Sequence, residues 1–328
     1  MKKLAIASLT ASVLMLAACG GGDTESDDAL TVGLTYIPDV QFFPFYVGVE
    51  KGYFEEAGVT VDLRHHGTQE ALFTAIATGE EDVVFTSGDE VMSGRDEGVE
   101  LTSIATLYSE YPATLIVPAD SDIETPEDLE GKTVGIPGEF GGTYFGLLAM
   151  IDYYDLQNVD VQTIGFTQMA ALSRGGVDAV IGFVNNDAVA MQTQGYDVRT
   201  IDLAPEVPLV GPGMAVMTED LAGNEEQYKA LMEGLNQAVE FAEENPEETL
   251  DIVTEYVSNM KDPDVREAAA ATMEATLPLY TGNDTVGYQD PELWEAMNTF
   301  MVDAELISGP VDISEAMTTD IVTNVIGN

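Results

Sequence analysis

Short runs of β-forming residues alternate with segments of helical periodicity from Leu30 to about Arg199, and this alternation constrains the fold more than any other feature of the chain. It is typical of parallel sheets covered by helices, so it predicts an α/β fold. We expect strands at Thr31–Thr35, Thr60–Arg64, Val83–Thr86, Thr102–Leu107, Thr133–Ile136, Asp160–Ile164, Ala179–Ile181 and Asp197–Ile201. We expect helices at Phe45–Glu56, Thr68–Thr78, Asp89–Asp96, Gly142–Tyr154, Met169–Arg174 and Asp187–Thr193.

The pattern becomes almost wholly helical from Glu219 onward. Before that point it indicates two α/β blocks, the second inserted into the first, so that two strands cross between two Rossmann-like lobes. We expect 30–118 with 209–328 to form the first lobe and 119–208 to form the second. A ligand should bind in the cleft between them, because open parallel sheets gather loops and helix N-termini at the carboxyl ends of their strands.

The N-terminus has the features of an exported, lipidated protein. Two lysines precede an apolar run, Leu4–Leu16, that is too short to span a bilayer, and two alanines then precede Cys19. We expect 1–18 to be a signal peptide and 19–29 to be a flexible polar tether. The pattern resembles the bacterial lipobox, which implies a diacylglycerol on the Cys19 thiol. The alternative is an ordinary signal peptide that ends on a chance cysteine.

The charge balance excludes several classes of partner. The chain has 59 acidic and 11 basic residues and a formal net charge of −48, which argues against binding nucleic acid or anionic lipid headgroups. The acids are scattered, without the spacing of a calcium loop, which favours a solvated surface adapted to high external salt over a cation store or a polyanionic sensor. The single cysteine excludes internal disulfides, cysteine-cluster zinc sites and iron–sulfur ligation.

Four loops that follow predicted strands carry residues suited to a small ligand. The first loop combines aromatic rings with an acid and an amide, and the second places hydroxyls at the start of a helix. The third has glycines that let the backbone approach a ligand, and the fourth ends on two carboxamides that can donate and accept. The candidate ligand-binding residues are Tyr36, Asp39, Gln41, Phe42, Ser87, Asp89, Glu139, Phe140, Gly141, Tyr144, Asn185 and Asn186.

These loops also have structural interpretations. The later aromatics of the first loop fit a core cluster, Ser87 or Asp89 can cap a helix, and the two asparagines can form an Asx turn. The glycine-rich loop suggests a phosphate cradle, but no lysine, arginine or Walker pattern accompanies it, so nucleotide hydrolysis is unsupported. Its Phe140 and Tyr144 favour a flat apolar ligand stacked on a ring.

The two histidines do not indicate a metal site. His65 and His66 are adjacent and directly follow the predicted strand Thr60–Arg64, and neighbouring side chains of an extended chain point to opposite faces, so the pair is a poor chelate. No arrangement of nucleophile, histidine and acid can be singled out. We therefore expect no metal, no cofactor and no catalytic residue.

Several motifs make nearly all of 30–328 resemble the solute-binding proteins of ABC importers, in the branch that includes sulfonate, thiamine-pyrimidine-precursor and riboflavin binders. These motifs are Gln41–Tyr46 with Lys51–Phe54 and Gly58–Val59, Ala77–Gly79 with Asp82–Val83, Thr125–Leu129 with Gly131–Lys132, Gly135–Pro137, and Gly175–Ala179. The resemblance implies the two-lobed periplasmic-binding-protein type II fold, with lobes that close on a ligand about a hinge and then dock on a membrane permease.

The segments Gly138–Tyr144, Gly165–Gln168 and Val184–Asn186 look like those of the vitamin-binding members. The resemblance therefore implies a monomer that captures a flat heterocycle, riboflavin or a thiamine pyrimidine precursor, for an ABC permease and its ATPase. It would be anchored to the outer face of the cytoplasmic membrane, or on the periplasmic side where an outer membrane exists. The alternatives are a sulfonate or nitrate binder and an enzyme similar to thiamine-pyrimidine synthases, which depend on a cysteine-rich motif that this chain lacks.

Overall fold

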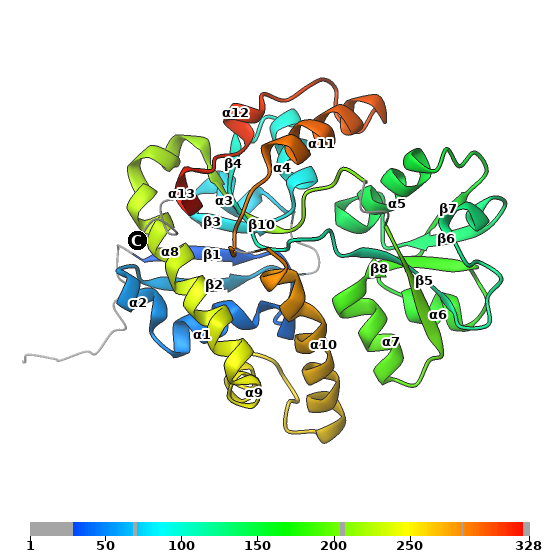
Figure 1. The fold of residues 1–328 in the computed structure, drawn as a ribbon, viewed down its shortest axis with the longest axis horizontal. Helices are drawn as coiled ribbons and strands as arrows, with labels where there is room; N and C mark the ends of the chain where they lie inside the picture. The colour runs from blue at the N-terminus through cyan, green and yellow to red at the C-terminus, as the bar shows by residue number, and fades with distance from the viewer. Residues whose placement is uncertain (1–28, 68–70, 204–206, 284, 324–328) are drawn as a thin grey trace, which may run out of the picture.

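Two five-stranded sheets, one in each of two lobes, organise the chain (Figure 1). The computed structural model describes residues 29–67, 71–203, 207–283 and 285–323, so Cys19, the expected signal peptide and nearly all of the expected tether lie outside the described residues. The first sheet, in the order β2-β1-β3-β10-β4, consists of β1 Leu30–Leu34, β2 Val61–His65, β3 Val83–Thr86, β4 Leu101–Thr106 and β10 Gly213–Met217. The second, in the order β7-β6-β8-β5-β9, consists of β5 Ala113–Pro118, β6 Thr133–Ile136, β7 Asp160–Thr163, β8 Ala179–Phe183 and β9 Val198–Asp202.

Helices pack around both sheets (Figure 1). The first lobe has α1 Phe43–Glu50, α2 Tyr53–Ala57, α3 Thr74–Thr78, α4 Gly88–Asp96, α8 Thr218–Glu244, α9 Pro246–Val253, α10 Pro263–Thr281, α11 Pro291–Asp303, α12 Ile313–Ala316 and α13 Asp320–Thr323. The second lobe has α5 Gly141–Tyr153, α6 Gln168–Ser173 and α7 Val189–Thr193. Two short 3-10 turns, Val40–Phe42 and Pro126–Leu129, and one π-helical turn, Val184–Ala188, complete the set.

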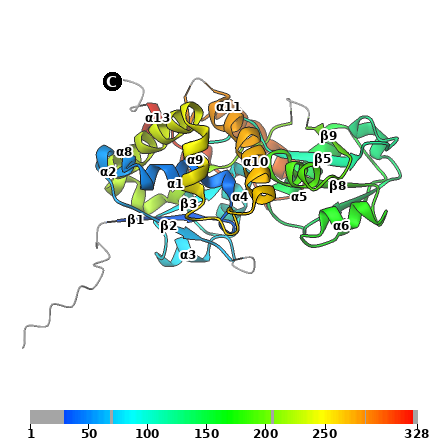
Figure 2. The same ribbon diagram turned by 90° about the horizontal axis from the view of Figure 1, so that it is seen from below.

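Each sheet separates two apolar cores, because successive side chains of a strand point to opposite faces. In β3, Val83 and Phe85 face the core beneath α1, α8 and α10, whereas Val84 faces the core with α3, α4 and α11. Figure 2 shows α1 and α3 on opposite sides of this sheet. In β8, Ile181 packs toward α5, whereas Val180 packs toward α6 and α7. Both sheets are therefore covered on both faces.

The two sheets are mixed, which corrects the expectation of parallel sheets. Strands β1, β2 and β3 are parallel, as are β6, β7 and β8, but β10 runs antiparallel to β3 and β4, and β5 runs antiparallel to β8 and β9. The carboxyl ends of the parallel strands face the other lobe. A strand that crosses from that lobe enters at this edge, so it must run antiparallel to its neighbours.

The crossing strands also move the expected boundary of the first lobe. Strand β5 hydrogen-bonds only within the second sheet, so the chain has crossed before Ala113, earlier than the expected change after residue 118. The return crossing ends at Gly213, where β10 joins the first sheet. The β-forming character of a crossing strand is visible in the sequence, but the sheet that it joins depends on which partners it meets.

Two expected helices differ from the structure. The segment Phe45–Glu56 forms two helices, because the chain turns at Gly52, which has a left-handed φ of 73°. The helix expected at Thr68–Thr78 begins only at Thr74, and residues 68–70 lie outside the described part of the chain. The helical C-terminal segment is confirmed.

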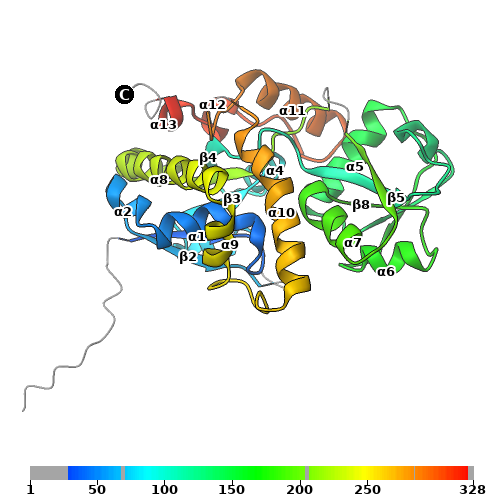
Figure 3. The same cartoon turned by 60° about the horizontal axis from the view of Figure 1, so that its bottom comes forward.

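The lobes share apolar and helical contacts. Phe145 and Ala149 of α5 pack in the same core as Trp294 and Met297 of α11, so this core spans both lobes. Helix α10 of the first lobe packs against α7 and the π-helical turn of the second lobe (Figure 3). The loops at the carboxyl ends of the two sheets are therefore brought against each other.

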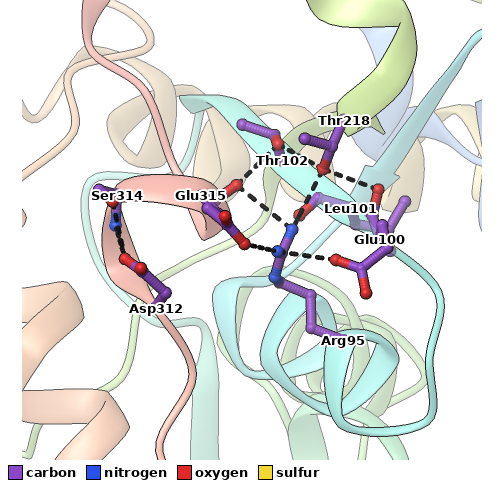
Figure 4. A network of polar contacts seen from close by, with 8 residues as sticks. All are labelled: Arg95, Glu100, Leu101, Thr102, Thr218, Asp312, Ser314 and Glu315. Atoms are coloured by element: carbon purple, nitrogen blue, oxygen red, sulfur yellow. Dashed lines mark hydrogen bonds and ion pairs between the residues drawn. The ribbon is translucent and has the colours of Figure 1, made fainter.

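A buried arginine joins the C-terminal segment to the first sheet (Figure 4). The guanidinium of Arg95 in α4 donates to the carbonyl oxygen of Leu101 at 2.6 Å and to the hydroxyl of Thr218 at 3.1 Å. It also pairs with the carboxylates of Glu100 at 2.8 Å and Glu315 at 2.9 Å. Only 6% of the Arg95 side chain is exposed. Its guanidinium therefore links α4 to β4, α8 and α12 from a buried position.

Candidate ligand-binding site between the lobes

The loop after β1 contributes a carboxylate that is hydrogen-bonded to the second lobe. Asp39 accepts hydrogen bonds from the backbone N–H of Gln41 at 3.1 Å and from Nδ2 of Asn186, on the π-helical turn of the second lobe, at 3.2 Å. Burial raises the pKa of Asp39, and these two hydrogen bonds oppose the rise. Two residues that the sequence singles out in separate loops are thus brought together at the junction of the lobes.

The other candidates in this loop divide between surface and core. Tyr36 remains 37% exposed, and its place in a ligand cleft stays a prediction. Phe42 is 2% exposed and packs edge-on against Phe85 at 5.5 Å, so it belongs to the core of the first lobe and its expected place in the cleft is wrong. Gln41 is also buried, and its carbonyl oxygen accepts from the hydroxyl of Tyr280 at 3.4 Å. The spacing of the aromatic residues along the sequence could not show which rings line the cleft and which pack in the core.

The loop after β3 begins a helix with a capping box. The carboxylate of Glu90 accepts from the hydroxyl of Thr86 at 2.8 Å and from the backbone N–H and hydroxyl of Ser87 at 3.0 Å each. Ser87 is therefore a helix cap, which was the structural alternative for this residue. Sequence reasoning missed Glu90, although the spacing of a serine three residues before a glutamate is the signature of such a box.

Asp89, in the same turn, differs from Glu90 in its hydrogen bonding. Its side chain is completely buried, and neither carboxylate oxygen has a hydrogen-bond partner among the described residues. Burial first, and the neighbouring Glu90 second, raise the pKa of Asp89 to about 8. A buried acid without a partner costs free energy, so its presence here calls for a function.

The glycine-rich loop of the second lobe lies against this turn. An added Cβ on Gly141 would lie 3.5 Å from Oε1 of Glu90, and the carbonyl oxygen of Gly142 accepts from the hydroxyl of Tyr111 at 3.0 Å. Tyr111 lies in 107–112, the first crossing segment, which leads from β4 to β5 and forms part of the hinge between the lobes. This segment, α4 and the second lobe therefore meet at this point. Glu139 is exposed, as is Phe140, the N-cap residue of α5.

The rings of this loop differ in exposure. Phe140 is 59% exposed, so it can stack on a ligand. Tyr144 is half-buried and packs against the core of the second lobe, with its ring centroid 6.0 Å from that of Phe145. Of the two expected stacking residues, Phe140 therefore has the free surface.

The π-helical turn after β8 supplies the two asparagines. Asn185 is fully buried and donates from Nδ2 to the hydroxyl of Thr276 in α10 at 3.0 Å, a second hydrogen bond between the lobes. In the part of the chain that the structure describes, its Oδ1 has no hydrogen-bond partner, and neither does the buried hydroxyl of Tyr108. Asp187 accepts from the backbone N–H of Phe183, four residues before it, at 2.8 Å. This is not the Asx turn considered for the two asparagines, in which a side chain accepts from the N–H two residues later.

Thr276 and Tyr108 are site residues that sequence reasoning missed. Thr276 lies in a long helix far along the chain, and Tyr108 lies in the segment that leads from β4 to β5. Neither belongs to a motif, and only the approach of α10 and the crossing segment places them beside the asparagines. Tyr280 packs against Tyr108 with ring centroids 5.1 Å apart.

The four loops at this junction are acceptor-rich and lack basic residues. No lysine or arginine occurs in 36–46, 86–90, 135–144 or 182–187. The buried acceptors without partners, on Asp89 and Asn185, face a region where two lobes meet. The arrangement suits a ligand that brings N–H or O–H donors and no negative charge.

The histidines diverge as expected. Nε2 of His65, the last residue of β2, lies 3.2 Å from the hydroxyl of Tyr46, whereas Nε2 of His66, the next residue, lies 2.8 Å from Oε1 of Glu81. Among the described residues there is no group of three or more histidine, cysteine, aspartate or glutamate residues that could hold a metal ion. In the same part of the chain, none of the helices has the length and apolar character needed to cross a membrane.

Comparison with known proteins identifies the family. The NMT1/THI5 like family matches residues 39–249. The chain is 30% identical over 301 residues to the riboflavin-binding protein RibY of Chloroflexus aurantiacus, which covers 89% of this chain and 86% of the relative. It is 24% identical over 326 residues to the formylaminopyrimidine-binding protein of Halalkalibacterium halodurans, which covers 96% and 98% of the two chains.

The fold is shared with a solved structure, the periplasmic aliphatic sulphonate binding protein SsuA of Escherichia coli. The TM-score is 0.72 at 16% identity, with 89% of this chain and 92% of the other covered. The expected two-lobed fold is thus confirmed. The two relatives described above, each aligned over most of its length, are named as binding proteins, which supports a substrate-binding protein and not an enzyme. By the extent of the family match and the identity to RibY, the chain belongs to the NMT1/THI5 like family.

Proposed function

We propose that this protein is a lipid-anchored solute-binding protein that captures an uncharged, flat heterocycle, riboflavin or a thiamine pyrimidine precursor, between its lobes and delivers it to an ABC permease. The observation that carries the proposal is the set of buried acceptors without partners in a junction that contains acids and no basic residues. The names of the two relatives, one for riboflavin and one for formylaminopyrimidine, agree with this ligand class.

The same observation argues against a sulfonate or nitrate ligand. Such anions present only acceptor oxygens, and they require cations or several N–H donors around them. Here they would meet the carboxyl groups of Asp39 and Glu90 and the carboxamide oxygen of Asn185. Flavin and pyrimidine rings instead combine a flat apolar face with an edge of donors and acceptors, which fits an exposed ring such as Phe140 beside buried acceptors.

Calorimetric titration tests the proposal. Riboflavin, an aminopyrimidine, taurine and nitrate should each be titrated into the purified protein, and we expect heat only from one or both heterocycles. Phe140→Ala should weaken that binding by about 1–3 kcal/mol, roughly 5- to 150-fold, because a stacked ring and its buried area are lost.

Tyr153→Ala provides the matched control for Phe140→Ala. Tyr153 is a 46% exposed aromatic residue at the opposite end of α5, so this change should leave the affinity as it is. Binding of taurine or nitrate without any response to the heterocycles would refute the proposed ligand class. An affinity that is equal in Phe140→Ala and the wild type would remove this ring from the site.

The lipid anchor is tested at Cys19. In Cys19→Ala we expect the protein to appear in the soluble extracytoplasmic fraction or the medium, because the thiol that would carry the diacylglycerol is gone. Immunoblots of membrane and soluble fractions measure the distribution, and a comparison of total protein controls for degradation. Equal membrane association of the mutant and the wild type would contradict anchoring at this residue.

The acid excess predicts a response to salt. We expect the melting temperature to rise between low and molar potassium chloride, since counter-ions screen the repulsion among 59 acids. Sucrose at equal osmolality is the control, because it favours compact states without screening charge. A melting temperature that follows sucrose and salt equally would count against adaptation of the surface to salt.

A further inference from the structure

Asp89 stands apart from the other buried acids of the site. Asp187 accepts a backbone hydrogen bond, and Glu90 accepts three hydrogen bonds within its capping box. The start of α4 is therefore capped by Glu90 without help from Asp89. Among the described residues, neither oxygen of the Asp89 carboxyl has a hydrogen-bond partner, although its side chain is fully buried.

The surroundings of Asp89 place it at the junction of the lobes. Ser87 and Tyr111 lie close enough to lower its pKa, but their hydroxyls donate to other oxygens, that of Ser87 to Glu90 and that of Tyr111 to Gly142. Helix α4 contacts α5 of the second lobe there. The carboxyl thus lies where the hinge, the first lobe and the glycine-rich loop converge.

The protonation state of this carboxyl determines what it can recognise. Burial and the charge of Glu90 raise the pKa of Asp89 to about 8, so that it holds a proton at neutral pH. A protonated carboxyl has one O–H donor beside one acceptor oxygen. This pattern is complementary to two adjacent groups on a ring, an N–H next to a ring nitrogen or next to a carbonyl oxygen.

We propose that Asp89 determines ligand specificity by forming paired hydrogen bonds with such an edge, accepting from the N–H and donating to the neighbouring nitrogen or oxygen. This inference rests on the proposed function and narrows it. The ligand must carry an amidine-like or imide-like edge, and a flat ring without an N–H there is rejected. The proposed ligand class is therefore defined by one hydrogen-bonding edge of the ring as well as by the flat face of the ring.

Matched ligands and variants test the pairing. The ligand pairs are riboflavin with its N3-methyl derivative, and a 4-aminopyrimidine with its dimethylamino derivative, so that each pair differs in its N–H. We expect the wild type to bind the N–H form at least tenfold more tightly. Asp89→Asn, which keeps a donor and an acceptor, should retain this preference, whereas Asp89→Leu should abolish it. Asp220→Leu, an exposed acid in the first turn of α8, is the control and should change neither affinity.

The pH dependence provides an independent readout. Glu90 on the same helix and Tyr111 on the crossing segment are the titratable groups that act on Asp89. Wild-type affinity for the N–H form should fall above about pH 8, where the carboxyl loses its donor proton, and that of Asp89→Asn should stay level across this range.

The outcomes separate the two proposals. If the wild type binds a heterocycle and Asp89→Leu discriminates the N–H form equally well, the role of Asp89 is overturned and the proposed function stands. If the wild type binds neither member of either pair, both are overturned. Melting curves accompany the titrations: because the carboxyl makes no hydrogen bond, Asp89→Leu should melt no lower than the wild type, and a large drop would assign Asp89 a structural role instead.

Discussion

Replacing Arg95 with methionine should lower the free energy of unfolding by about 2–4 kcal/mol, because it removes the cation from a buried network and leaves its acceptors without donors. Methionine fills a similar volume, so the loss reports on polar contacts and not on a cavity. The carbonyl oxygen of Leu101 and the carboxylate of Glu315 both lose an Arg95 donor (Figure 4). Urea denaturation followed by circular dichroism measures the change in midpoint and slope.

Lys132→Met is the matched control for this prediction. Lys132 pairs with Asp122 at 2.7 Å, but the Asp122 side chain is 81% exposed, and exposed pairs of this kind contribute about 0–1 kcal/mol. The two variants remove the same charge from a protein that is already strongly acidic. If both lost stability equally, the effect of Arg95 would be one of net charge and not of its buried hydrogen bonds.

Gly211→Ala should destabilise the protein by about 1–3 kcal/mol or more, because the two crossing segments touch at this residue. A Cβ on Gly211 would lie 2.5 Å from the carbonyl oxygen of Tyr108, which is backbone and cannot rotate away. The segments are also held by hydrogen bonds of 2.9 Å from the backbone N–H groups of Leu107 and Tyr108 to the carbonyl oxygen of Pro212. Separating them should disturb the hinge, so ligand affinity should fall together with the melting temperature.

Gly223→Ala makes the same chemical change in an open position and should have the opposite sign. Gly223 lies within α8, and an added Cβ would meet no atom within 4 Å. Alanine there should raise stability by about 0.5–1 kcal/mol, because glycine loses more conformational freedom in a helix. Equal stability of the two variants would show that the crossing segments tolerate a side chain and are less tightly held than the distances indicate.

Most of the fold could be predicted because its signals are local. The β-forming run that ends at Thr86 and the helical pattern from Glu219 onward are set by neighbouring residues, and both elements formed where expected. The direction and sheet of β5 and β10 could not be predicted in this way. A crossing strand has the same composition as a parallel one, and its partners lie 64 to 131 residues away in the chain.

The candidate site was predicted in outline and corrected in detail. The loops at the strand ends were correctly brought together, as the contact of Asp39 with Asn186 shows. Phe42 was misplaced, because an aromatic residue after a strand can turn toward the core or the cleft with the same local sequence. Thr276 and Tyr108 had no sequence signal, since their place in the site depends on how α10 and the crossing segment pack.

By itself, the sequence determined the α/β alternation, the inserted second block, the glycine-rich loop and the acid excess, because each depends on residue type and spacing along the chain. Only the tertiary structure decided the direction of the crossing strands and which side chains are buried at the junction of the lobes. It alone showed that Ser87 caps a helix with Glu90, while Asp89, two residues after Ser87, is buried without a partner. The physical reason is that burial and hydrogen bonding are properties of a position in space, and segments from both lobes create that position.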